Sequence, residues 1–150
     1  MPGRWSMRGA ASRWLFITLL ACASVPVQAQ KAVVLSGDRS YEGQLEDGEP
    51  YGFGTMVYPN GTRYTGDFVS GYREGRGTAV FYDASRYTGE WRNDIPHGRG
   101  VYEWPTGARY EGEVVENTMH GSGVLTLPNG ERYEGLFVKG EWQGRAKSKP

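Results

Sequence analysis

The sequence predicts an all-β protein, an elongated single-layer antiparallel β-meander built from about five hairpin repeats. Three observations predict it: a 23-residue period that starts at Tyr41 and continues without insertion, polar–apolar alternation inside each unit, and turn signals between the alternating segments. After residue 29 there is no 3.6-residue or heptad pattern that would predict a helix. The units are residues 41–63, 64–86, 87–109 and 110–132, with a partial fifth unit at 133–150.

Residues 1–29 have the pattern of a cleavable secretory signal. Three arginines and no acidic residue accompany an apolar stretch of about 12 residues, which is shorter than the ~20 residues that span a membrane. Small residues precede position 30, so we expect cleavage after Ala29 and an exported protein, periplasmic or secreted. A second interpretation stays open: Cys22 follows Leu-Leu-Ala, which loosely matches a bacterial lipobox and would make the protein lipid-anchored at Cys22.

Composition restricts the classes of partner. Cys22 is the only cysteine, so a chain cleaved after Ala29 would contain no disulfide. The whole sequence has 17 basic and 17 acidic residues; without the three arginines of the signal the remainder has 14 and 17, a net charge of −3. Nucleic acids are bound through basic surfaces, so we expect no nucleic-acid partner.

Each unit opens with a strand that places a tyrosine, a glycine and an apolar residue on one face, as in residues 109–114. A two-residue turn follows, at positions where glycine, asparagine or aspartate adopts positive φ at low cost. The first-strand tyrosines and glycines, which we take as structural repeat residues, are Tyr41, Gly43, Tyr64, Gly66, Tyr87, Gly89, Tyr110, Gly112, Tyr133 and Gly135. The turns hold Asp47-Gly48, Ser70-Gly71, Asn93-Asp94, Glu116-Asn117 and Lys139-Gly140.

The second half of each unit alternates again and ends in a turn such as Pro59-Asn60-Gly61, where Asn-Gly is a strong hairpin signal. Its glycines, Gly54, Gly77, Gly100 and Gly123, offer flat backbone on which a neighbouring aromatic ring can lie. A ribbon of this kind has two broad faces and little interior. Residues 30–40 imitate the end of a unit, so we expect a capping strand there.

The pattern Tyr-x-Gly-x-aromatic, followed by turn glycine and Gly-x-Gly at a strict 23-residue spacing, resembles the MORN (membrane occupation and recognition nexus) repeat. The resemblance covers residues 41–146 and implies a curved sheet used as a non-catalytic scaffold for protein contacts and self-association, sometimes credited with phospholipid binding. Leu45 and Val114 replace the aromatic residue, so we expect looser ring packing in the first and fourth units. Ala84 replaces the glycine of the second long turn.

No arrangement of reactive residues predicts catalysis, a metal or a cofactor. His97 and His120 share a column, but equivalent positions lie two strands apart, roughly 9 to 10 Å, whereas two ligands of one zinc ion each lie ~2 Å from the metal. We therefore expect His97 and His120 to be polar residues near turns and not metal ligands. The arginine column, Arg63, Arg86, Arg109 and Arg132, shares a face with acidic residues, and we expect cross-strand ion pairs there; a phosphate-gripping arginine ladder is the alternative.

The aromatic columns are the candidate partner-binding residues. Tyr58, Phe81 and Trp104 share one position, and Tyr102 lies on the same face. They either cover glycines only or also meet a partner, because a single layer cannot bury both of its faces. We expect a non-enzymatic scaffold that binds another protein or itself; a membrane-peripheral module for phospholipid or glycan is the alternative.

Overall fold

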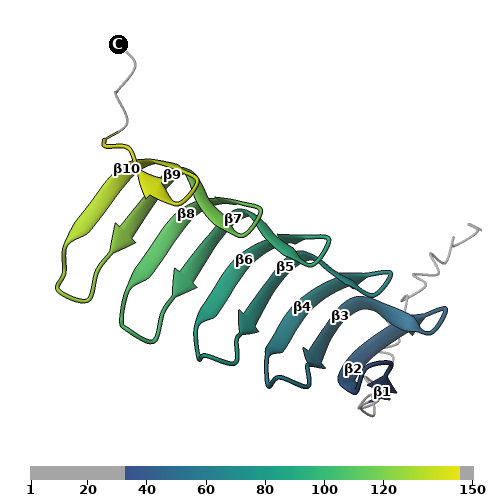
Figure 1. The fold of residues 1–150 in the computed structure, drawn as a ribbon. Coiled ribbons are helices and arrows are strands. Elements are labelled where there is room, and N and C mark those ends of the chain that lie inside the picture. Colours follow the sequence, from purple (N-terminus) through teal and green to yellow (C-terminus); the bar gives the residue numbers. More distant parts are fainter. Residues whose placement is uncertain (1–32, 146–150) are drawn as a thin grey trace, which may run out of the picture.

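A computed structural model, which describes residues 33–145, contains one open antiparallel sheet whose eleven strands follow each other in chain order (Figure 1). The predicted all-β meander is confirmed, and the 23-residue period corresponds to one hairpin. The strands are β1 (Val33–Leu35), β2 (Arg39–Glu46), β3 (Glu49–Val57), β4 (Arg63–Val69), β5 (Tyr72–Val80), β6 (Arg86–Arg92), β7 (Ile95–Glu103), β8 (Arg109–Val115), β9 (Thr118–Thr126), β10 (Arg132–Val138) and β11 (Glu141–Trp142).

Two predictions concern the ends of the chain. The signal at residues 1–29 lies outside the described residues, as do residues 30–32 of the expected capping strand and residues 146–150 of the tail. Within the described part, β1 pairs with the start of β2, with Val33 opposite Tyr41. β11 pairs with the end of β10 through two residue pairs.

The two kinds of turn differ in backbone geometry. In the short turns both residues have positive φ, for example 51° at Asp47 and 84° at Gly48, which matches the right-handed strand twist as a type I′ turn does. In the long turn after β3, the N–H of Gly61 donates to the Tyr58 carbonyl at 2.9 Å. Gly61 has a φ of 86°, whereas the φ of Asn60 is not positive. Asn-Gly is therefore not the centre of a two-residue turn there; Pro59 and Asn60 form the turn and Gly61 follows in a G1 bulge.

Ala84 occupies the position of Gly61 in the second long turn, with a φ of 66°. Its N–H donates to the Phe81 carbonyl at 3.0 Å, so the turn forms despite the strain on Cβ. The left-handed conformation costs alanine about 1 kcal/mol or more. Glycine avoids this cost, but its greater conformational entropy in the unfolded chain offsets part of the gain. We expect Ala84→Gly to raise the free energy of unfolding by about 0.5–1 kcal/mol, measured by urea denaturation.

Gly107 supplies the matched control for that prediction. It has a φ of 90° and only one distant neighbour for an added Cβ, Pro128 at 3.8 Å. Gly107→Ala should therefore lower the free energy of unfolding by a similar amount through backbone conformation alone. Equal stability of the Ala84→Gly variant and the parent chain would contradict the argument.

Glycines form a continuous row across the sheet. Gly43, Gly54, Gly66 and their equivalents are direct cross-strand partners from β2 to β10, and each row member is a Tyr-x-Gly glycine or the second glycine of Gly-x-Gly. Next to the row the register shifts, for example after Gly43, where Gly52 and Phe53 of β3 have no partner on β2. Gly52 has a φ of 65°, as a bulge requires. The first glycine of Gly-x-Gly therefore makes the bulge.

The second glycine makes room for a ring. A Cβ on Gly77 would overlap the Tyr64 ring, and the same tyrosine–glycine relation holds at Gly54, Gly100 and Gly123. This confirms that rings lie on glycine backbone. Tyr64 also meets Phe68 and Trp91 edge-on, with centroids 5.0 and 5.1 Å apart. Such edge-to-face contacts run from Tyr41 to Tyr87 and occur again between Tyr110 and Phe137.

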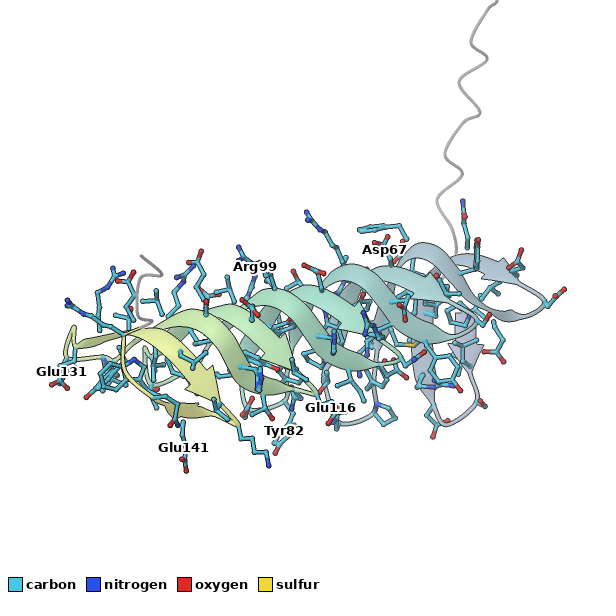
Figure 2. The ribbon with its side chains drawn as sticks, turned by 90° about the horizontal axis from the view of Figure 1, so that it is seen from above. Asp67, Tyr82, Arg99, Glu116, Glu131 and Glu141 are labelled. Carbon is cyan, nitrogen blue, oxygen red and sulfur yellow. The ribbon has the colours of Figure 1, made fainter. Side chains whose placement is uncertain are left out.

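The interior is larger than the sequence predicts. Tyr41, Tyr64, Tyr87 and Tyr110 are fully buried, and so is Val114. The prediction of little interior is wrong because the bulged strands are curled (Figure 2). Asp67 and Arg99 project from the side of the sheet opposite the buried tyrosines. In the fourth unit Val114 is fully buried but supplies no ring contact between Tyr87 and Tyr110, and in the first unit Leu45 is 41% exposed.

Candidate functional site

The structure places the four predicted partner-binding aromatics against the core. Tyr58, Phe81 and Trp104 are partly buried and pack on it, and Tyr102 is 9% exposed. The Tyr102 ring lies 4.5 Å from that of Tyr87 and stacks on Trp104 at 5.6 Å, and its hydroxyl donates to Asn117 Oδ1. These contacts hold Tyr102 and Trp104 against the core, and the partner-binding role of the four aromatics stays a prediction.

The structural tyrosines are held by a repeated hydrogen bond. In each complete unit the tyrosine hydroxyl donates to a carbonyl three residues later, as Tyr87 does to Glu90 at 3.0 Å and Tyr110 to Glu113 at 2.7 Å. Burial raises the pKa of Tyr87 and of Tyr110 to about 12, and the neighbouring carboxylates act in the same direction. The hydroxyls therefore remain protonated donors at neutral pH. Tyr133, in the partial unit, is only half-buried.

On the opposite face, which we call the outer face, acidic residues bind backbone rather than arginine. The Asp67 carboxylate accepts from the Arg76 N–H at 3.1 Å, and the Glu90 carboxylate accepts from the Arg99 N–H at 3.2 Å. These N–H groups belong to the bulges, where strand pairing leaves donors free. The prediction of cross-strand ion pairs is wrong for Asp67 and Glu90. The Arg109–Glu111 pair, at 2.8 Å, lies within one strand.

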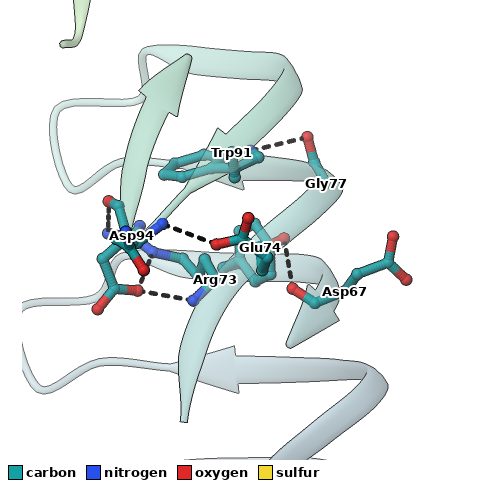
Figure 3. Close-up of polar contacts among 8 residues, drawn as sticks. Asp67, Arg73, Glu74, Gly77, Trp91 and Asp94 are labelled. Atoms are coloured by element: carbon teal, nitrogen blue, oxygen red, sulfur yellow. Dashed lines mark hydrogen bonds and ion pairs between the residues drawn. The ribbon is translucent and has the colours of Figure 1, made fainter. Parts of the chain in front are cut away.

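Arg73 is a partly buried charged residue of the inner face (Figure 3). Its guanidinium bonds the Asp94 carboxylate at 3.0 Å and the Asp94 carbonyl at 2.7 Å, and lies 4.3 Å from the centre of the Trp91 ring. Tyr58 and Tyr64 are 5.6 and 5.7 Å from it. Because Arg73 belongs to the second unit and Asp94 to the third, this cluster joins two repeats. The repeat pattern gives no sign of this cluster, since the equivalent positions hold Pro50, Pro96, Met119 and Trp142.

Neighbouring hairpins are also joined by a backbone hydrogen bond at four of the five short turns. Gly71 N–H donates to the Pro50 carbonyl at 2.9 Å, and Asp94 N–H donates to the Arg73 carbonyl at 3.0 Å. The same bond is made by Asn117 to Pro96 and by Gly140 to Met119. The short turns therefore stand in a regular line along one rim of the sheet.

Apolar side chains flank these turns on the outer face. We call them the tip row: Val69, Tyr72, Ile95, Val115 and Val138, which are between 38% and 54% exposed. The first unit has Glu46 and Glu49 at the equivalent positions. A line of partly exposed apolar residues over four consecutive hairpins is unusual for a surface without a partner. The alternation of the strands could have identified this row, because its members lie on the face opposite the tyrosines.

The outer face also has shallow hollows along the glycine row. One, of about 860 Å³, lies over β7 to β10 between Arg99 and Arg145, and another, of about 570 Å³, lies over β3 to β7. Thr65, Thr78 and Thr88 border the second, and the Thr78 and Thr88 hydroxyls are 3.1 Å apart. Glu90 stands between Arg76 and Arg99, so neither sign of charge dominates this surface.

Residues 33–145 show no grouping suited to a metal ion: no three His, Cys, Asp or Glu side chains converge there. His97 and His120 lie on β7 and β9, separated by the β8 strand. In the same range no helix has the length and apolar character needed to cross a membrane.

An open sheet made of repeated hairpins, each bonded only to its neighbours, defines the class of repeat proteins in which function resides on a repeated surface. The family model of the MORN repeat matches four times, at residues 41–63, 64–86, 87–109 and 110–132. The chain therefore belongs to the MORN repeat family, which is generally a non-catalytic module for protein or membrane interactions. Comparison with curated proteins gives no match.

Proposed function

We propose that the protein is a non-enzymatic scaffold in the cell envelope or secreted space, and that its tip row binds another protein. The observation that carries the proposal is the exposure of five apolar side chains in one line, while Tyr58, Phe81 and Trp104 pack partly buried against the core. Protein interfaces have an apolar, aromatic centre with a polar rim. The tip row has this composition, since Tyr72 lies among aliphatic residues and Arg92 lies opposite Ile95.

A protein partner fits the tip row better than a membrane does. Peripheral membrane binding combines apolar residues with an excess of basic charge. Near the tip row, however, Arg92 and Lys139 are accompanied by Glu74, Glu116 and Glu141, so basic charge is not in excess. A phospholipid or glycan ligand is the outcome that the experiment must separate from a protein.

Site-specific crosslinking in cells tests the proposal. A photoreactive phenylalanine analogue at Tyr72, which is 54% exposed, should give a discrete protein adduct. The same analogue at Tyr82, which is 76% exposed in a long turn, is the matched control and should give none. Adducts of equal intensity at the two positions, or lipid adducts alone at Tyr72, would refute a protein-binding tip row.

Export requires its own measurement. The signal pattern at residues 1–29 supports an exported protein, and Cys22 offers lipid attachment as the alternative. Mass spectrometry of the protein from fractionated cells should give an N-terminus at Gln30. A lipid-modified N-terminus at Cys22 would favour anchoring, and an intact N-terminus in the cytoplasmic fraction would contradict export.

A further inference from the structure

The two hollows of the outer face join into one long and shallow surface. Both are lined by Arg99, and the glycine row from Gly66 to Gly135 forms their floor. Together they extend over β3 to β10, which at a strand spacing of about 4.8 Å corresponds to roughly 34 Å. We call the residues that line the two hollows the outer track. Its length and shallow depth suit a linear chain that lies across the strands better than a small compact molecule.

Polar side chains on both sides of the glycine row are already held in place. On one side, the hydroxyls of Thr55 and Thr65 are 3.0 Å apart. Those of Thr78 and Thr88 are 3.1 Å apart. Each pair uses one hydroxyl proton and keeps one donor and several lone pairs for a ligand. On the other side, the Arg99 N–H fixes the Glu90 carboxylate at 3.2 Å, so this acceptor loses little freedom when a ligand binds.

Arginines supply further donors to the outer track. Within residues 33–145 the guanidinium groups of Arg76 and Arg99 make neither an ion pair nor a hydrogen bond, and each offers five N–H donors. The charges of the outer track balance, with Arg76, Arg99 and Arg145 against Glu90, Glu111 and Glu134. A neutral ligand with many hydroxyls can satisfy donors and acceptors together, whereas the carboxylates repel a polyanion.

An exposed aromatic ring lies at one end of the outer track. Phe53 is 67% exposed and lines the hollow over β3 to β7. It occupies the position between two glycines that Arg76 and Arg99 occupy in the next two units. The apolar C–H face of a sugar ring stacks on such an aromatic ring, while the hydroxyls at the edge of the sugar bind to polar side chains. This combination of groups favours a carbohydrate.

An extended peptide fits the outer track less well. A peptide that adds to a sheet gains affinity from main-chain hydrogen bonds at a free strand edge. Strands β3 to β10 are each paired on both sides, so a chain that lies across them meets no free edge. A membrane surface also fits poorly, because peripheral membrane binding uses an excess of basic charge and the charges of the outer track balance.

We propose that the outer track binds a neutral, linear polysaccharide whose sugars are β-1,4-linked. Such a chain is a flat, extended ribbon with apolar faces and hydroxyl-bearing edges, whereas an α-1,4-linked chain coils. One sugar would stack on Phe53, and the sugars that follow would bind to the threonine pairs, Glu90 and Arg99. The outer track shares no residue with the tip row, so this site stands or fails independently of the proposed function.

Titration of the purified chain with neutral hexasaccharides, followed by its backbone amide NMR signals, tests the proposal. Cellohexaose or N-acetylchitohexaose, both β-1,4-linked, should bind with a Kd of about 1 mM or lower and should shift amide signals of β3 to β7. Comparison of the two separates a glucose chain from an amino-sugar chain. Maltohexaose, which is α-1,4-linked, should bind at least about tenfold more weakly.

Variants of the outer track locate the site. Phe53→Ala should raise the Kd at least about fivefold, because it removes the stacking surface. Thr78→Val with Thr88→Val removes two hydroxyls at nearly constant volume and should raise the Kd by a similar factor. Tyr82→Ala is the matched control, since Tyr82 is 76% exposed but lies in a long turn outside the outer track. It should bind as the parent chain does, and so should Tyr72→Ala in the tip row.

Four results would overturn the proposal. The first is no saturable binding of either β-1,4-linked hexasaccharide up to about 5 mM. The second is equal affinity for maltohexaose, and the third is an equal Kd for the Phe53→Ala and Tyr82→Ala variants. The fourth is tighter binding of heparin, a polyanion, than of the neutral hexasaccharides. Circular dichroism of each variant should match that of the parent chain, so that a changed Kd reports on the site and not on folding.

Discussion

Replacing Gly77 with alanine is expected to lower the free energy of unfolding by about 3 kcal/mol, at the upper end of overpacking penalties. The added Cβ would overlap the ring of Tyr64, which is fully buried between Phe68 and Trp91 and has no free space to move into. Urea denaturation followed by tryptophan fluorescence measures the loss, because Trp91 lies beside that ring.

A double-mutant cycle identifies the cause of the loss. All three nearest neighbours of the added Cβ at Gly77 are atoms of Tyr64, so Tyr64→Leu should relieve the overlap and give a coupling of about 2 kcal/mol. Gly66 is the matched control, because a Cβ there would also meet the Arg76 carbonyl and the Gly77 Cα. Gly66→Ala should therefore remain as costly in the Tyr64→Leu background. Equal coupling at the two glycines would show that the tyrosine ring is not the obstacle.

Features set by local chemistry could be predicted from the sequence. The strands follow from alternation, and the short turns follow from residues such as Asp47-Gly48, because positive φ and face alternation depend only on neighbouring residues. The glycine that receives each ring was also predictable, since Tyr64 and Gly77 recur at fixed spacing. Each pattern occurs in four complete units, so each inference has four independent instances. The same repeated pattern therefore predicts both the fold and the family.

Features set by pairing between strands and by packing between side chains could not be predicted. The bulge after Gly43 requires knowledge of which residues fail to pair, and the curl that encloses the tyrosines results from that bulge. The sequence predicts that the Asp67 carboxylate pairs with arginine, because it does not show that the bulge leaves a backbone N–H for this carboxylate to bind. For the candidate site, alternation predicts that Tyr102 and Trp104 lie on one face. It does not predict whether other rings cover that face.

The charged cluster in Figure 3 yields the second large effect: Arg73→Met should lower the free energy of unfolding by about 2 kcal/mol. Methionine is the residue of the fourth unit at this position, so it fits the inner face. The loss arises because Asp94, whose side chain is 40% exposed, keeps its charge after the guanidinium 3.0 Å away is removed. Partial exposure of Asp94 keeps the effect below that of a fully buried pair.

Adding Asp94→Gly should restore most of that stability, to within about 1 kcal/mol of the parent chain. Glycine stands at the equivalent turn position in Gly48, Gly71 and Gly140 and adopts the φ of 66° found at Asp94 without strain. The double variant thus rebuilds the uncharged contact used between other units, and the turn N–H can still donate to the carbonyl of residue 73. Thermal and urea unfolding of the two single variants and the double variant measure the coupling. If the double variant is as unstable as Arg73→Met alone, the stabilisation comes instead from the guanidinium over the Trp91 ring, 4.3 Å away, and the ion pair contributes little.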